Sequence, residues 1–170
     1  MFWFREIEAI VMKYLKQSRL TMIPIRAAVP SDIAQLAALL HELFTIENDF
    51  VFDPVKQTNG LNHLLNSEKD FILVAESSKV NKVVGMCTIQ TLISTAEGGQ
   101  VGLLEDLVVA AGFRHQGIGS KLLAEAVYWA ERRGLKRLQL LADKNNLPAL
   151  GFYKNQGWLS TELVCLRRLA

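Results

Sequence analysis

The sequence predicts an α/β sandwich, because strand-like and helix-like segments alternate along the chain around one mixed sheet. Apolar runs separated by short polar turns are typical of strands, and amphipathic stretches before and after them are typical of helices. The chain has 170 residues, of which 50% are hydrophobic and 21% are charged. This length and composition predict one globular domain with a substantial core.

The most informative stretch covers residues 101–133 and reads VGLLEDLVVA, AGFRHQGIG and SKLLAEAVYWAERR. The first segment has the length and the Leu/Val content of a buried strand. The last segment places its apolar residues on one helix face, and Gly134 then ends the helix. A strand, a glycine turn and a helix N-terminus together favour an anion site, because unpaired amides and the helix dipole attract negative charge.

The other elements follow from the same criteria. Further strands are expected at 23–29, 71–76, 83–93, 137–142 and 163–169. Pro30-Ser31-Asp32 is expected to cap a helix that runs to about Phe44, and Asp53-Pro54 to cap a helix that runs to about Leu65. A last helix is expected between Asn146 and Gly157.

Residues 1–21 are expected to be a helical extension of a single domain that covers residues 22–170. Phe4, Ile7, Val11 and Tyr14 repeat at intervals of three and four, which is typical of an amphipathic helix. Charged residues at 5, 6 and 8 argue against a signal peptide. Three interpretations are open: a docked helix, a membrane-surface helix, or upstream codons wrongly included. We favour docking on the same domain or on a second subunit, which leaves a homodimer open.

Within the anion loop, Arg114, Gly117 and Gly119 fit the pattern Arg/Gln-x-x-Gly-x-Gly/Ala. A dinucleotide fingerprint would need a glycine where Leu122 stands, and a P-loop would need Gly-Lys where the chain has Gly117-Ile118. The hexapeptide resembles the acyl-CoA pyrophosphate loop of the Gcn5-related N-acetyltransferases, the GNAT superfamily. A turn that only connects strand to helix is the structural alternative.

A second motif makes the resemblance more specific. The family pattern of Asn, Ala, Tyr and Gly-aromatic is matched in order by Asn146, Ala149, Tyr153, Gly157 and Trp158. The resemblance covers roughly residues 23–160. It implies the GNAT-type fold, a mixed and mostly antiparallel sheet flanked by helices on both faces. It also implies an N-acetyltransferase in which an amine attacks acetyl-CoA, the acyl-donor cosubstrate, directly and without a metal.

The resemblance also implies roles for individual residues. Glu105 matches the position of a glutamate base, and Tyr153 matches the tyrosine that protonates the coenzyme thiolate. Strand alternation predicts that Glu105 and Asp106 face opposite sides of the sheet. The alternatives are a structural carboxylate at Glu105 and a core aromatic at Tyr153. The expected coenzyme-binding residues are Leu107, Val108, Val109, Arg114, His115, Gln116, Gly117, Ile118, Gly119, Ser120, Asn146 and Tyr153.

The acceptor is an amine whose identity the sequence leaves open. The connection between the first two expected helices carries Glu42, Glu47, Asp49 and Asp53, either as a solvated acidic loop or as carboxylates that attract a cationic amine. A non-catalytic acyl-CoA-binding or regulatory module on the same fold is the rival from another functional class.

Charge, hydrophobicity and cysteine content indicate which partners and which cell compartment are expected. A net charge of +2, with basic residues spread along the chain, argues against a nucleic-acid partner. No apolar run reaches membrane-spanning length. Cys87 and Cys165 each lie in an apolar run, without a disulfide framework or a metal motif, and are expected to be buried, reduced thiols of a cytoplasmic protein.

Overall fold

The computed structural model describes residues 23–46 and 49–168. The helical extension expected at residues 1–21 lies outside the described residues. In chain order the elements are β1 (Ile25–Ala27), the 3-10 turn η1 (Pro30–Asp32), α2 (Ile33–Phe44), α3 (Pro54–Leu65), β2 (Phe71–Ser77), β3 (Lys82–Ser94), β4 (Gly99–Val109), the 3-10 turn η2 (Ala111–Phe113), α4 (Ile118–Arg132), β5 (Leu138–Leu140) and α5 (Leu147–Asn155).

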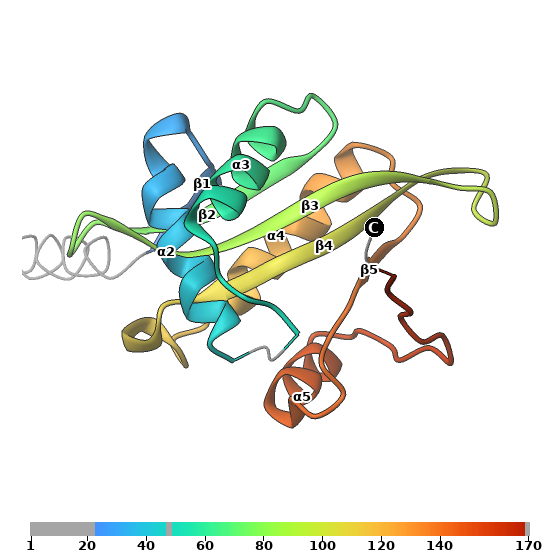
Figure 1. Ribbon diagram of the computed structural model, residues 1–170. Coiled ribbons are helices and arrows are strands. Elements are labelled where there is room, and N and C mark those ends of the chain that lie inside the picture. The colour runs from blue at the N-terminus through green and yellow to red at the C-terminus, as the bar shows by residue number, and fades with distance from the viewer. Residues whose placement is uncertain (1–22, 47–48, 169–170) are drawn as a thin grey trace, which may run out of the picture.

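The five strands form one sheet in the order β1-β2-β3-β4-β5 (Figure 1). The first four strands pair antiparallel, and β5 pairs parallel to β4 over three residues, with Gly102 opposite Leu138. The long β3–β4 ladder forms the centre of the sheet. The predicted fold class, a mixed and mostly antiparallel sheet with helices on both faces, is confirmed.

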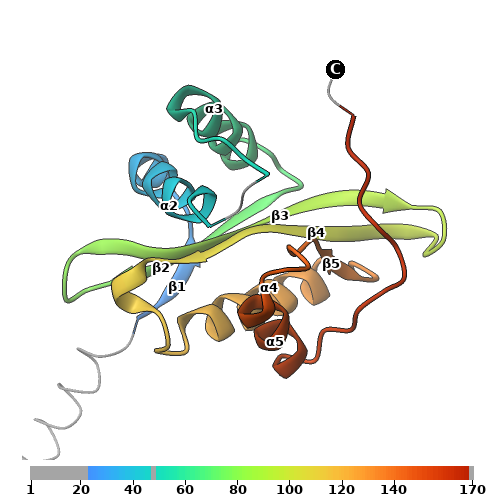
Figure 2. The same cartoon turned by 60° about the horizontal axis from the view of Figure 1, so that its bottom comes forward.

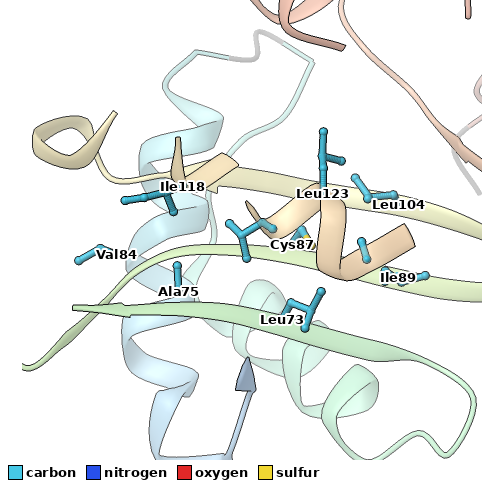
Figure 3. Close-up of a cluster of buried hydrophobic side chains, with 10 residues drawn as sticks. Leu73, Ala75, Val84, Cys87, Ile89, Leu104, Ile118 and Leu123 are labelled. Carbon is cyan, nitrogen blue, oxygen red and sulfur yellow. The ribbon is translucent and has the colours of Figure 1, made fainter. Parts of the chain in front are cut away.

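Helices cover the two faces of the sheet in two layers (Figure 2). Helices α2 and α3 lie on one face and bury Leu36, Leu40 and Leu61 against it. Helices α4 and α5 lie on the other face, where Ile118 and Leu122 pack against the sheet residues shown in Figure 3. Alternate residues of the central strands therefore feed two separate apolar layers.

The local signals in the sequence placed most helix ends correctly. Helix α3 begins directly after Asp53, whose carboxylate accepts hydrogen bonds from the amides of Val55 and Lys56. Helix α4 ends at Gly134, which has a φ of 70°. Such a left-handed residue lets the chain leave a helix, and glycine adopts it without steric cost.

Asp32 has a different role from the predicted helix cap. Its carboxylate accepts no hydrogen bond from the first turn of α2. It instead accepts from the Arg26 guanidinium at 2.7 and 3.0 Å and from the Val29 amide at 2.8 Å. The hydrogen bonds from Arg26 hold the pKa of Asp32 below its ordinary value. The carboxylate therefore ties β1 to the start of α2.

The strand expected at 163–169 is not formed over residues 163–168. Leu163, Val164 and Leu166 are 79–89% exposed, and Cys165, expected to be buried, is exposed as well. Strand β5 offers an edge of only three residues, too short to template a further long strand. In the described part of the chain, no helix combines the length and apolar character needed to cross a bilayer.

Candidate active site

The loop between β4 and α4 has the geometry of an anion site. Gly117 is the residue before α4 and has a φ of 76°, and His115 also has a positive φ, of 60°. No described residue accepts a hydrogen bond from the backbone amides of residues 115–120. The helix dipole adds partial positive charge at the same place. The loop can therefore hold a phosphate group through backbone donors alone.

Arg114 fixes the start of this loop. Its Nε donates to the Val109 carbonyl at 2.9 Å, and its Nη2 lies 3.8 Å from a Glu42 carboxylate oxygen. The same Glu42 oxygen accepts a hydrogen bond from the Ala111 amide at 3.1 Å. Glu42 thus joins α2 to the anion loop. Asp53 likewise accepts hydrogen bonds from backbone amides, at the start of α3. Two of the four acidic residues expected near the acceptor therefore hold backbone in place.

The two glycines of the motif serve different purposes. A Cβ added at Gly117 would meet no atom within 4 Å, which leaves open space in front of the loop. A Cβ added at Gly119 would lie 3.3 Å from the ring of Phe152 in α5. Gly117 thus keeps the approach to the amides open, whereas Gly119 lets α5 pack closely on the first turn of α4.

Strand β4 contains a bulge at the candidate catalytic position. Thr88 of β3 pairs with Glu105, but Met86 pairs with Val108, so that two residues of β4, Asp106 and Leu107, oppose one residue of β3. Asp106 has a φ of 52°, in the left-handed region. The bulge interrupts the regular ladder at Leu107, the first of the expected coenzyme-binding residues in β4.

The bulge brings Glu105 and Asp106 to the same face, contrary to the alternation predicted from the sequence. Gln90 Nε2 donates to a Glu105 carboxylate oxygen at 2.6 Å, and the Thr88 hydroxyl donates to Asp106 at 3.1 Å. Thr88 and Gln90 are two positions apart in β3 and so share a face. This is the face that α2 and α3 cover, because Met86, two residues before Thr88, belongs to their apolar layer.

Thr88 and Gln90 are functional candidates that the sequence did not single out. Thr88 is fully buried, and both side chains orient a carboxylate through a neutral donor. No motif marks them, since their role depends on the register between two strands. The one sequence signal that could have found them is the presence of two polar residues, Thr88 and Gln90, inside the largely apolar run of β3.

The outer edge of β4 has no strand partner beyond Leu104. Strand β5 pairs with residues 102–104 and ends at Leu140, so the β4 backbone from 105 to 109 is not covered on that side by any strand of the described chain. This edge includes Leu107, Val108 and Val109, three of the expected coenzyme-binding residues, and the carbonyl of Val109 already accepts the hydrogen bond from Arg114 Nε. It lies between the face of Glu105 and the face covered by α4 and α5, and it leads directly into the anion loop.

Helix α5 brings the second motif to the α4 side of this edge. Asn146 caps the helix by accepting a hydrogen bond from the Ala149 amide at 3.2 Å. Tyr153 is half-buried beside Phe152 and Trp158, with ring centroids 5.4 and 6.1 Å away, and it packs on the apolar layer that contains Ile118. Asn146 thus caps the helix that the sequence predicts to begin there, and Tyr153 packs on the apolar layer next to Phe152, whose ring lies close to Gly119 in the first turn of α4.

Cys87 lies opposite the bulge of β4, in the core of the sheet. Cys87 is fully buried, and burial raises the pKa of its thiol to about 12, so it is protonated at neutral pH. Within residues 23–46 and 49–168 no group of three or more His, Cys, Asp or Glu side chains could hold a metal ion.

Comparison with known proteins identifies the family. The acetyltransferase (GNAT) family matches residues 36–158. An uncharacterized N-acetyltransferase of Archaeoglobus fulgidus is 30% identical over 134 residues, 78% of this chain and 90% of that protein. A transcriptional regulator from Bacillus halodurans C-125 shares the fold, with a TM-score of 0.77 and 23% identity over 87% of this chain and 100% of that one. An aminoglycoside acetyltransferase from an uncultured soil metagenomic sample, solved with trehalose, has a TM-score of 0.70 and 25% identity over 87% and 95%. The chain belongs to the acetyltransferase (GNAT) family, whose general activity is acetyl transfer.

Proposed function

We propose that this protein transfers an acetyl group from acetyl-CoA to a primary amine, by direct attack of the amine on the thioester. One observation carries the proposal: the β4 edge from 105 to 108, which no strand of the described chain covers, leads into the anion loop, where no described residue accepts a hydrogen bond from the amides of residues 115–120. Acetyl-CoA has amide groups along its pantetheine arm and a diphosphate beyond it. A free strand edge can form hydrogen bonds with the pantetheine amides, and a helix N-terminus can bind the diphosphate.

The two carboxylates at the bulge supply the base. An alkylamine has a pKa near 10 and arrives mostly protonated at neutral pH, so a proton must leave before the nitrogen can attack. Glu105 is partly exposed, and the Gln90 amide fixes its orientation. We assign Glu105 as the base, acting directly or through water, and Asp106 as a second negative charge that favours a cationic acceptor.

The acid is Tyr153. Its helix, α5, packs through Phe152 on the first turn of α4, on the face of the sheet opposite to the carboxylate of Glu105, which supports this role. In the balanced step the amine nitrogen bonds to the carbonyl carbon, the carbon–sulfur bond breaks, and the phenol donates its proton to the departing sulfur. Glu105 takes the first proton from the ammonium group before the attack and passes it to water. It then accepts the second nitrogen proton as the amide forms, and solvent afterwards deprotonates Glu105 and reprotonates Tyr153. The products are an N-acetyl amine and free coenzyme A.

The test is release of free thiol from acetyl-CoA across a panel of small amines, polyamines, amino-sugars and peptides. We expect turnover with at least one cationic amine, and a loss of roughly 10²–10⁴-fold in kcat for Glu105→Gln, the usual effect of removing one positioned base. Glu131→Gln, an exposed carboxylate on α4, is the matched control and should retain wild-type turnover.

The loss in Glu105→Gln should be largest at low pH with strongly basic amines, because these acceptors arrive charged. Acetyl-CoA binding without turnover on any amine would favour the non-catalytic acyl-CoA-binding module. Wild-type rates for Glu105→Gln at every pH would remove Glu105 as the base and leave Asp106 as the candidate.

A further inference from the structure

A second concave surface lies on the α4 side of the sheet, at its β1 end. This β1–α4 hollow has a volume of about 370 Å³ and is lined by residues 25–27 of β1, Phe71 and Leu73 of β2, and one face of α4 from Glu125 to Arg133. Its helical wall lies roughly 12–24 Å along α4 from Gly117, given the rise of about 1.5 Å per residue of an α-helix. The hollow is therefore separate from the candidate active site.

Stacked aromatic rings hold the wall of the hollow in place. Phe71 and Trp129 are parallel within 5°, with ring centroids 5.1 Å apart, and the guanidinium of Arg133 lies 5.2 Å from the Trp129 ring centre. Tyr128 presents a ring that is 51% exposed, with Arg132 at 5.7 Å. The surface is thus preformed, aromatic and bordered by positive charge.

The neighbouring sheet edge is also uncovered. Strand β1 has three residues and pairs only with β2, and no other strand of the described chain lies along its outer side. Ile25 lines the hollow and is only partly buried. A helix or loop that covers a strand edge is one way in which proteins protect such an edge, and the aromatic part of the hollow beside it could receive the apolar face of that segment.

We propose that residues 1–20 of the same chain form an amphipathic helix that docks in the β1–α4 hollow. The segment has an apolar stripe at Phe4, Ile7, Val11 and Tyr14, which needs an apolar partner to be stable as a helix in water.

Connectivity favours this occupant over any other. The segment enters the domain at β1, the strand that lines the hollow. The ten residues from Tyr14 to Pro24 could span up to roughly 33–36 Å if extended, more than the hollow requires. A tethered segment acts at a high effective concentration, so a modest contact area suffices for docking.

Limited trypsin digestion of the full chain tests the docking. A docked helix protects the bonds after Lys13, Lys16 and Arg19, and cleavage then tracks the population of the undocked state. Tyr128→Asp should accelerate these cleavages about tenfold, since it removes an aromatic contact and adds a charge in the hollow. Val127→Asp is the control: Val127 is also exposed on α4 but does not line the hollow. Equal cleavage rates in the wild type and in Tyr128→Asp would overturn the proposal.

A photo-cross-link identifies the occupant. In a Cys165→Ser chain, Glu125→Cys at the rim carries a maleimide-benzophenone, while Cys87 is buried and unlabelled. Adducts within residues 1–20 that migrate as monomer are expected. Adducts in a dimer band would assign the hollow to a second copy, and adducts only outside residues 1–20 would exclude the segment; either result overturns the proposal.

Discussion

Two glycines with the same backbone conformation allow a test of the anion loop. Gly117 precedes α4 with a φ of 76°, and Gly134 follows α4 with a φ of 70°. An added Cβ would meet nothing within 4 Å at either position. Asparagine is among the residues that best tolerate this left-handed conformation. Gly117→Asn and Gly134→Asn therefore impose similar backbone strain, but only the first places a side chain in front of the loop amides.

The expected effect follows from the hydrogen bonds at stake. If the Gly117→Asn side chain keeps a phosphate from one or two amides, the loss is about 1–3 kcal/mol, the range for a buried polar group left unpaired. This corresponds to a roughly 5–150-fold rise in the Kd for acetyl-CoA, measured by titration calorimetry. Gly134→Asn should bind like the wild type, and the two variants should melt within a few degrees of each other. Unchanged affinity in a folded Gly117→Asn chain would refute the assignment of the loop.

Three further results are expected. Tyr153→Phe should still bind acetyl-CoA but slow single-turnover acetyl transfer by roughly 10²–10⁴-fold, with little dependence on the basicity of the amine. Gly102→Ala should lower the free energy of unfolding by about 1–3 kcal/mol, because a Cβ there would collide with Leu138 of β5 and overpack the site. Its thermal midpoint should therefore fall, whereas that of Gly60→Ala, on the exposed face of α3, should rise. Asp32→Asn should destabilise the fold by about 1.5–3 kcal/mol at pH 7. Because its hydrogen bonds lower the pKa of Asp32, that difference should be complete above the ordinary carboxyl pKa of 3.8 and shrink as the pH falls below it, as melting curves against pH would show.

The sequence predicted the elements whose causes are local. The proline and aspartate at the start of α3, the glycine after α4 and the asparagine before α5 each act through residues a few positions away. The same holds for the anion loop, which is a strand end, a positive φ and a helix start in one continuous stretch. These features need no knowledge of what lies across the fold.

The misplaced features depend on distant partners. The apolar pattern of residues 163–168 suits a strand, but a strand needs an edge to pair with, and β5 provides only three residues. Asp32 has the sequence position of a cap, but the Arg26 guanidinium from β1 competes for its carboxylate. From the sequence, Glu42 belongs to an acidic stretch that could simply face solvent. In the structure its carboxylate accepts a hydrogen bond from the amide of Ala111, 69 residues later. In all three cases the deciding partner, the short β5 edge, the Arg26 guanidinium or the Ala111 amide, lies more than a helical turn away along the chain.

The bulge at Asp106 is the clearest case of this kind, and it determines the chemistry of the site. A non-glycine residue in the left-handed region costs about 1–3 kcal/mol, so something must hold it there. The hydrogen bond from the buried Thr88 hydroxyl to the Asp106 carboxylate contributes a comparable stabilisation of about 1.5–3 kcal/mol. The strained backbone turns Asp106 onto the face of Glu105 and breaks the ladder beside the free edge of β4. A regular β4 would have sent one carboxylate into the apolar layer beneath α4, so the bulge that gathers Glu105 and Asp106 on the α2–α3 face also keeps a carboxylate out of the core on the other face.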